Sequence, residues 1–423
     1  MLESSAPRDM LGRSRLTKVA AAQSLLLSEI TKLKPDTEIL SINQALDRIG
    51  SEQIISPEDL PGNDRSTMDG FAVVAADTFG ASQSMPAYLD LSGEVIMGAL
   101  SDGSVSRGKC YKIPTGGLLP VGADAIVMHE HTVPVDDQVI EIIKGVGTGT
   151  NVIRRGDDIG KGEIAIDIGR RLRPQDLGLL AGLGIVEIEV FKPIMVGIVS
   201  TGDEIIDYRD TPQPGKIRNI NSIVINGLCK RYGAEVCDYG IVADDESTFF
   251  TAIEGAVEET DLVLFSGGSS VGMRDLGEQA IERLGNPGIL IHGVSLKPGK
   301  PVIIGLCNDT PVFGLPGHPV SAMVCFDFFV RPTILSLSGR LHKDVGFHPS
   351  VTAKLMRNIN SAAGRLDVVR VTLTFSEGTM EAHPVLGKSG AISTLSQADG
   401  YFLIDEDCQG CNTEEFVEVY LYQ

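Results

Sequence analysis

The feature that most constrains the fold is an alternation of apolar and helix-forming segments between residues 193 and 338. Short apolar runs predict strands at Ile194–Val199, Val236–Val242, Leu262–Phe265 and Val302–Ile304, with helices between them near 222–231, 246–258 and 275–284. The helical segments are long enough to connect parallel strands. The alternation therefore predicts an α/β domain with a mainly parallel, doubly wound sheet, closed by a long helix over 319–337.

The rest of the chain predicts smaller units around this domain. Helices are expected over 16–34 and 40–49, and again from Pro174 to Leu183, where proline begins the segment and glycines end it. Residues 56–143 and the C-terminal segment instead alternate short apolar runs with Gly, Pro and Asp turns. This pattern is typical of small β domains.

Charge and composition exclude several kinds of partner. The chain has 36 Lys and Arg against 56 Asp and Glu, a net charge of −20, which repels nucleic acid and anionic lipid surfaces. No apolar run approaches the roughly 18 residues of a membrane helix, and the N-terminus lacks a signal-peptide pattern.

Seven scattered cysteines are typical of a reducing compartment, so we expect a soluble, cytoplasmic protein. Cys408 and Cys411 have redox spacing, but no second pair or nearby cation supports a role, and we interpret them as structural.

Three glycine-rich loops follow strands of the predicted sheet. They are Ser200–Glu204, Ser266-Gly267-Gly268 with the residues after it, and Gly314–Ser321, which contains Pro316 and Gly317. Ligands of open α/β sheets bind at the carboxyl ends of the strands. Glycine N–H groups and a helix N-terminus can hold an anion there. One such loop would be an ordinary turn, but three at one edge predict a site.

Charged residues accompany these loops. Glu204, Asp244 and Asp275 fall just after strand ends, and carboxylates there suit Mg²⁺. Asp244 has an equally good alternative as a helix cap. Lys297 and Lys300 flank a Pro-Gly turn and predict an anionic ligand, although a surface ion pair remains an alternative.

Other motifs are weaker when considered alone. The segment Asn63–Phe71, which contains Asp69, and the segment Lys112–Gly117, which contains Thr115, are explained equally well as turns. His129 and His131 flank Glu130 at strand spacing, but no third metal ligand accompanies them.

Taken together and in order, the motifs resemble one family. They are Arg65–Val73, Thr115-Gly116-Gly117 with Gly122–Ala125, Gly156–Ile159, Ser200–Glu204, Ser266–Gly268, Lys297–Pro301 and Gly314–Gly317. The resemblance is to the molybdopterin molybdenumtransferases (MoeA, and the E domain of gephyrin), and it runs from about residue 17 to the C-terminus.

The resemblance implies a four-domain, elongated homodimer. Domain I would be discontinuous (16–55 and 145–190), domain II an inserted β domain (56–144), domain III the α/β molybdopterin-binding domain (191–338) and domain IV a C-terminal β domain (339–423), with residues 1–15 outside them as a flexible segment. The implied reaction is Mg²⁺-dependent insertion of molybdate into adenylylated molybdopterin, with release of AMP. An upstream molybdopterin adenylyltransferase is a candidate partner.

The resemblance also assigns site residues. Catalytic positions are Glu204, Asp69, Asp275 and Lys297; substrate-binding positions are Thr115, Asp158, Ser266, Gly267, Gly268, Lys300, Pro316, Gly317, Arg370 and Ser389; metal positions are Glu204, Asp244 and Asp275. Asp69 and Thr115 would reach the cleft from the partner subunit. Departures from the family pattern occur at Gly293 in place of Lys, His318 in place of Asn, Leu276 in place of Tyr, Gly117 in place of Ala and Asp157 in place of Glu.

Three alternatives remain open in the sequence. An adenylyltransferase would not need the Met-Asp-Gly domain or the region around Arg370, and both are present. A scaffold would not need Glu204, Asp275 and Lys297. Tungstate in place of molybdate cannot be distinguished by sequence.

Overall fold

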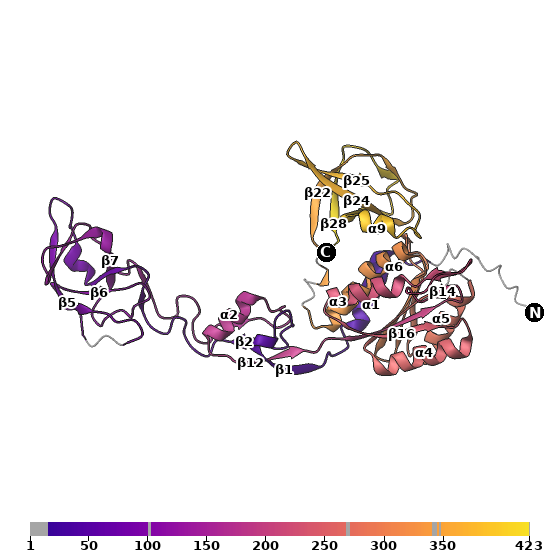
Figure 1. The fold of residues 1–423 in the computed structure, drawn as a ribbon, viewed down its shortest axis with the longest axis horizontal. Helices are drawn as coiled ribbons and strands as arrows, with labels where there is room; N and C mark the ends of the chain where they lie inside the picture. Colours follow the sequence, from indigo (N-terminus) through magenta and orange to yellow (C-terminus); the bar gives the residue numbers. More distant parts are fainter. Residues whose placement is uncertain (1–15, 100–102, 268–270, 341–344, 347, 423) are drawn as a thin grey trace, which may run out of the picture.

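The computed structural model describes residues 16–99, 103–267, 271–340, 345–346 and 348–422. The molecule is elongated: an arm ending in a β domain extends from an α/β unit, on which a second β domain sits (Figure 1). The predicted fold class, a multidomain α/β plus β protein, is confirmed.

The α/β unit contains a six-stranded sheet in the order β16-β13-β17-β21-β20-β18. Its strands are β13 (Met195–Thr201), β16 (Glu235–Val242), β17 (Leu262–Gly267), β18 (Gly288–His292), β20 (Ile303–Cys307) and β21 (Thr310–Pro316). The first four strands of this order run parallel, and β20 and β18 continue the sheet antiparallel. The crossover helices are α3 (Asn221–Arg231), α4 (Glu246–Glu259) and α5 (Val271–Leu284). The predicted strands and helices are therefore present, and the sequence missed β18 and β21.

A long apolar helical segment covers this sheet. It consists of α6 (Pro319–Cys325), the π-helical turn η4 (Phe326–Val330) and α7 (Arg331–Leu337). By length and composition alone Pro319–Leu337 could cross a membrane, but 78% of its most apolar window is buried inside the protein. It packs with helix α1 (Val19–Ile30) in the largest hydrophobic core, so it is a core helix.

The narrow middle of the molecule contains residues from both segments predicted for domain I. It contains the antiparallel pairs β1 (Thr37–Ser41) with β12 (Glu187–Phe191) and β2 (Ile54–Ile55) with β11 (Ile164–Ile166), and helix α2 (Pro174–Gly182). The helix predicted over 40–49 is wrong. Leu40 and Ser41 complete β1, and only the 3₁₀ turn η1 (Ile42–Gln44) follows. Pairing with the distant β12 satisfies this backbone, and a local pattern does not reveal that partner.

Domain II, at the end of the arm, is a six-stranded sheet in the order β7-β4-β6-β5-β9-β8. Its strands are β4 (Gly70–Val73), β5 (Ala87–Glu94), β6 (Lys109–Ile113), β7 (Ala125–Met128), β8 (Thr132–Pro134) and β9 (Val139–Ile142), with the 3₁₀ turns η2 (Ala75–Thr78) and η3 (His129–His131). The pair β3 (Arg65–Ser66) and β10 (Val152–Ile153) joins it to the arm. His129 and His131 lie on η3 rather than on a strand, so their spacing does not have the alternation of a strand.

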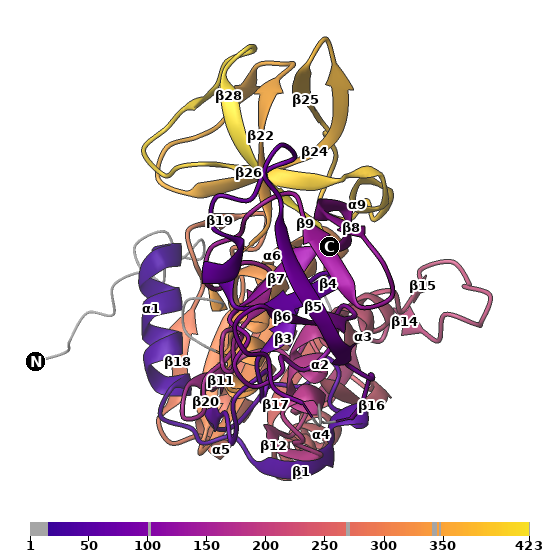
Figure 2. The same cartoon turned by 90° about the vertical axis from the view of Figure 1, so that its left-hand side faces the viewer.

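Domain IV closes into a barrel above the α/β unit (Figure 2). The strands β22 (Ser350–Leu355), β24 (Leu366–Ser376), β25 (Thr379–Pro384), β26 (Gly400–Ile404) and β28 (Phe416–Leu421) pair in a ring. The pair β23 (Ile359–Asn360) and β27 (Gly410–Cys411) and helix α9 (Ser393–Gln397) complete the domain. The short strand β19 (Leu296–Lys297), from the α/β unit, pairs with β24 and connects the two domains.

Candidate active site

The carboxyl ends of the four parallel strands meet at one edge of the sheet. Thr201 at the end of β13 is in register with Val242 of β16 and with Gly267 of β17, and Gly267 is in register with Pro316 of β21. The three glycine-rich loops predicted from the sequence therefore begin side by side. Because β20 runs antiparallel to β21, the loop before β20, which contains Lys297 and Lys300, enters at the same edge.

Gly267 is required by the spacing of the strands. A Cβ at this position would lie 2.0 Å from the backbone carbonyl oxygen of Thr201, too close for any side chain. The preceding Ser266 is buried near the carboxyl end of β17. Gly268, the third residue of this predicted motif, lies outside the described residues.

Asp244 faces the loop after β13. The Thr201 hydroxyl donates a hydrogen bond to Asp244 Oδ1 at 2.6 Å, and the Asp203 N–H donates to Oδ2 at 3.3 Å. The helix cap is the next residue: Asp245 accepts from the Thr248 N–H at 2.9 Å at the start of α4. Hydrogen bonds from the Thr248 hydroxyl and from this N–H lower the pKa of Asp245 to about 2. The capping alternative for Asp244 is therefore wrong, because Asp245 has that role.

Glu204 and Asp275 complete the set of carboxylates predicted at this edge. Glu204 follows Gly202, whose φ of +141° disfavours other residues. It lies just before the parallel pair β14 (Ile205–Ile206) and β15 (Ile217–Arg218). Asp275 is exposed in the second turn of α5. Within the described ranges, no three His, Cys, Asp or Glu side chains are close enough to hold a metal ion by themselves.

Lys297 connects the edge to domain IV. Its Nζ lies 2.9 Å from Asp367 Oδ2, and the Arg365 Nε lies 2.8 Å from the other oxygen of the same carboxylate. Asp367 is buried, whereas the Lys297 side chain is 52% exposed. Two cations on one carboxylate leave a net positive charge at the junction. The sequence missed Asp367 because its partner is 70 residues away.

Domain IV contributes two more predicted residues. Arg370 on β24 is buried and donates to the Gly387 carbonyl at 3.3 Å. No partner of its Nε lies among the described residues, and burial lowers the pKa of its guanidinium. The Ser389 hydroxyl lies 3.2 Å from His318 Nδ1, and its carbonyl accepts from the Val320 N–H at the start of α6. Ser389 is thereby attached to the Pro316–Gly317 loop.

Asn219 and Asn221 are polar residues of this edge that the sequence analysis missed. Asn219 donates to the Ser200 hydroxyl at 2.9 Å, and Asn221 donates to the Gly317 carbonyl at 3.0 Å. In the described part of the chain, the buried Oδ1 of Asn221 has no donor. Both residues lie where β15 leads into α3, a connection without a glycine-rich or charged motif to indicate it.

Asp69 and Thr115 form a separate site in domain II. Asp69 Oδ1 accepts from the Thr115 N–H at 2.7 Å and from its hydroxyl at 3.0 Å. These two bonds lower the pKa of Asp69. Within one chain this pair is remote from the strand edge: β6 and β7 lie at one end of the molecule, and α5, α6 and β14 at the other (Figure 1). Asp158 is exposed in the arm between them.

Comparison with known proteins covers this whole architecture. Residues 17–184 match the MoeA N-terminal region (domains I and II), residues 197–336 match a domain described as "Probable molybdopterin binding domain", and residues 352–422 match the MoeA C-terminal region (domain IV). The chain belongs to the MoeA family.

Relatives of this MoeA chain match it over nearly its full length. The molybdopterin molybdenumtransferase of Haemophilus influenzae is 32% identical over 94% of this chain and 96% of its own, and that of Bacillus subtilis is 30% identical over 91% and 90%. A crystal structure of a molybdopterin biosynthesis MoeA protein from Pyrococcus horikoshii OT3 is 32% identical, covers 96% of this chain and 100% of its own, and has a TM-score of 0.84.

Five departures from the usual MoeA motifs can be placed in their local structure. Gly293 has a φ of +80°, and a Cβ there would lie 3.0 Å from Leu16, so this backbone disfavours the usual Lys. At Gly117 a Cβ would lie 2.8 Å from the Pro114 carbonyl oxygen, which disfavours Ala. His318 exchanges the usual amide for an imidazole that contacts Ser389. Leu276 packs on an apolar cluster, and Asp157 accepts from the Arg154 N–H at 2.7 Å.

Proposed function

We propose that this chain is a molybdopterin molybdenumtransferase that inserts molybdate into adenylylated molybdopterin and releases AMP. The observation that carries the proposal is the register of Thr201, Val242, Gly267 and Pro316, which brings the predicted loops to one edge of the sheet. Full-length likeness to molybdenumtransferases supports the same chemistry. We also propose a cytoplasmic location, which the seven free cysteines support because free thiols are typical of a reducing compartment.

The chain's own residues would bind and orient a polyanion. Lys297, held against Asp367 but half exposed, and Lys300 supply positive charge for phosphate and molybdate oxygens. Main-chain N–H groups of the glycine loops and the N-terminus of α6 add donors. Ser389 and Arg370 would close the site from domain IV. No nucleophilic side chain is needed, because an oxygen of molybdate can itself attack the phosphate link of the adenylylated pterin.

The carboxylates at the strand edge fit a Mg²⁺ site in which substrate oxygens and water supply the other ligands. Mg²⁺ in phosphate-binding sites uses one or two carboxylates, substrate oxygens and water, so a complete protein cage is not required. Glu204, Asp244 and Asp275 would hold the ion, with Asp244 oriented by Thr201 and Asp203. Bound Mg²⁺ supplies positive charge to the oxygens of the phosphate link.

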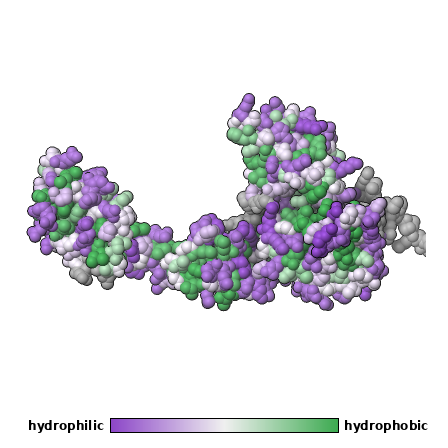
Figure 3. All heavy atoms as spheres, viewed as in Figure 1, coloured by the Kyte–Doolittle hydropathy of each residue, from purple (hydrophilic) through white to green (hydrophobic). Residues whose placement is uncertain are grey.

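A homodimer would complete the site. Asp69 and Thr115 lie far from the strand edge of their own chain, so we expect them to serve the site of a partner subunit. Domain I supports this assembly, because its narrow surface carries apolar residues that monomers seldom expose together (Figure 3). They are Ile39, Leu46, Ile55, Ile164, Ile168 and Val186.

The test is turnover with adenylylated molybdopterin, Mg²⁺ and molybdate, followed by AMP release and active cofactor. We expect Glu204→Gln to reduce turnover by about 100-fold or more with unchanged thermal unfolding, as loss of one charge-stabilising group does. The matched control is Glu235→Gln, because Glu235 begins β16 at the opposite edge of the sheet and is exposed.

Each alternative has its own outcome. AMP release with tungstate but not with molybdate would identify a tungstate-inserting enzyme. Tight binding of the adenylylated pterin without AMP release would indicate a scaffold. Full activity of Glu204→Gln would reject the assigned role of this residue. A pull-down with an upstream adenylyltransferase would test that partner.

A further inference from the structure

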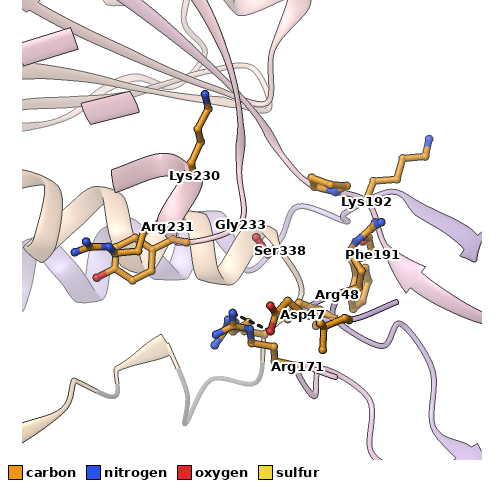
Figure 4. A pocket seen from close by; sticks show the side chains of 14 residues that line it. Asp47, Arg48, Arg171, Phe191, Lys192, Lys230, Arg231, Gly233 and Ser338 are labelled. Atoms are coloured by element: carbon orange, nitrogen blue, oxygen red, sulfur yellow. Dashed lines mark hydrogen bonds and ion pairs between the residues drawn. The ribbon is translucent and has the colours of Figure 1, made fainter. Parts of the chain in front are cut away.

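A cavity of about 240 Å³ lies at the junction of domain I and the α/β unit, but its basic side chains do not converge (Figure 4). The ends of Lys192 and Lys230 point apart, and Arg171 is paired with Asp47 at 3.0 Å. Because these cations diverge, the cavity does not indicate an anion-binding site.

Apolar side chains are exposed beside the Asp69 site of domain II. Val95, just after β5, packs in the domain core with 2% exposure. The next two side chains are exposed, Ile96 by 71% and Met97 by 55%, and Met68, directly before Asp69, is 42% exposed. In the described part of the chain, none of these three side chains belongs to a hydrophobic core, so packing within the domain does not explain them.

Met97 is held over the turn that carries Thr115. The Val95 N–H donates to the Lys112 carbonyl at 2.8 Å, which fixes the chain beside β6 just before Met97. The Met97 Cε lies against Gly116, where a Cβ would be 3.5 Å from it. Since Gly116 follows Thr115, the Met97 methyl group borders the hydrogen-bonded pair of the domain II site.

Met68 is attached to the same turn. The Gly116 N–H donates to the Ser66 carbonyl at 2.8 Å, and the Met68 N–H donates to the Ser66 hydroxyl at 3.2 Å. From the neighbouring position, Arg65 Nη1 donates to the Gly116 carbonyl at 3.0 Å. Hydrogen bonds therefore hold the backbone of both exposed methionines at one turn.

A hydrogen-bond acceptor is available beside these methionines. Both bonds from Thr115 go to Asp69 Oδ1, and within the described ranges no residue donates to Asp69 Oδ2. An acceptor next to exposed apolar surface suits a flat heterocycle that carries an amino group, because the ring packs on the apolar side chains and the amino group donates to the carboxylate. Methionine is well suited to such a contact, because its thioether is polarizable and packs favourably on aromatic rings.

We infer that Met97, with Met68, contacts an aromatic ring of the substrate bound at the strand edge of the partner subunit. The inference rests on the proposed function, because adenylylated molybdopterin supplies the ring. It has two candidate rings, adenine and the pterin, and both carry an amino group. Met97 would therefore contribute to recognition of the substrate, while the charged residues at the strand edge act on its phosphate link.

The first test is nuclear magnetic resonance of the full chain with carbon-13 in the methionine methyl groups, titrated with adenylylated molybdopterin in the absence of molybdate. We expect the Met97 methyl proton resonance, assigned with Met97→Leu, to move upfield, because a methyl group above the face of a ring is shielded. AMP and molybdopterin, as separate arms, identify which ring is contacted. Met85, 66% exposed just before the other end of β5, is the internal control, and its resonance should not move.

The second test is steady-state turnover of variants. Met97→Ala should raise the KM for adenylylated molybdopterin about two- to tenfold with little change in kcat, because a methionine–ring contact is lost while the reacting phosphate link keeps its own contacts. Met97→Leu keeps the apolar bulk and should change KM less. The matched control, Met85→Ala, removes an equally exposed methionine of the same domain and should leave KM unchanged.

The outcomes separate this inference from the proposed function. An unmoved Met97 resonance at saturating adenylylated molybdopterin would overturn the inference, and so would an unchanged KM of Met97→Ala. Turnover of the natural chain together with an unmoved resonance would reject only the ring contact. A moved resonance without any turnover would retain the ring contact and reject the proposed function. A Met97 resonance that changes with protein concentration but not with ligand would show that the surface of the partner subunit covers Met97, and it would overturn the inference as well.

Discussion

At the level of single residues, Gly267 lies where β17 and β13 approach each other too closely for a side chain. We expect Gly267→Ala to lower the free energy of unfolding by about 1–3 kcal/mol, because its Cβ would lie 2.0 Å from the Thr201 carbonyl oxygen and would force β17 away from β13. Urea unfolding followed by circular dichroism measures this. The matched control is Gly255→Ala on α4, where no atom lies within 4 Å of the new Cβ; it should stabilise the chain by roughly 0.5–1 kcal/mol. Equal effects of the two changes would contradict the packing argument.

Asp176 is a second residue whose environment gives a measurable prediction. Burial raises its pKa, but hydrogen bonds from Arg173 and Arg170 lower it more, to about 2 from 3.8. The ionised Asp176 carboxylate therefore contributes roughly 2 kcal/mol to the free energy of unfolding above about pH 4. This contribution is lost as the pH falls towards 2.

Unfolding of Asp176→Asn across this pH range tests the direction of this change in stability with pH. The variant should be less stable than the natural chain near neutral pH, and the difference should shrink below about pH 4. The matched control is Asp309→Asn, which removes the same charge from the exposed β20–β21 turn. A difference that stays constant with pH would contradict the assignment to the ionised carboxylate.

At the level of elements, the junction between the covering helix and domain IV depends on Asp327 in η4. This buried carboxylate accepts from Arg331 Nε at 2.9 Å, lies 3.3 Å from His348 Nε2 and accepts from the Tyr401 hydroxyl of β26. Burial raises the pKa of Asp327, but the hydrogen bond with His348 and the positive charge of Arg331 lower this pKa by more than burial raises it. The carboxylate therefore stays ionised.

We expect Asp327→Ala to cost about 3–5 kcal/mol, because it removes the buried carboxylate that pairs with Arg331. Tyr401→Phe should cost less, about 1.5–3 kcal/mol, because only one hydrogen bond to the carboxylate is lost. Guanidinium unfolding of both variants gives the comparison. Because Tyr401→Phe keeps the ring, a larger cost for it would mean that the hydrogen bond of the Tyr401 hydroxyl, rather than the ion pair with Arg331, holds the junction.

The elements also show what the sequence could and could not predict. The parallel strands, the crossover helices and their loops were predictable, because each has its own periodicity and its own glycines. β18, β21 and β1 were not predictable, since their backbone hydrogen bonds go to antiparallel partners or to strands that are distant in the sequence. In the site, Glu204, Asp275 and Lys297 were indicated by position after a strand or beside a turn. Asn219, Asn221 and Asp367 were missed because only the tertiary fold brings them to the edge.

At the level of the whole molecule, the distance between the arm and the strand edge predicts shared active sites. In a two-fold dimer, each site would combine domain III of one chain with Asp69 and Thr115 of the other. We expect Asp69→Asn and Glu204→Gln each to be inactive alone and to recover activity when mixed and allowed to exchange subunits. Recovery should reach about a quarter of the natural activity, because half of randomly mixed dimers are heterodimers and each has one intact site.

The control for this complementation is a mixture of Asp69→Asn with Thr115→Val. Both changes lie in domain II and share one hydrogen-bonded pair, so each site of their heterodimer carries one altered residue, and no recovery is expected beyond the activity of the single variants. Dimer formation in every mixture is checked by light scattering. Absence of recovery in both mixtures would mean that each site is built within one chain by movement of the arm, whereas recovery confined to the first mixture requires the arm of one subunit to reach the strand edge of the other.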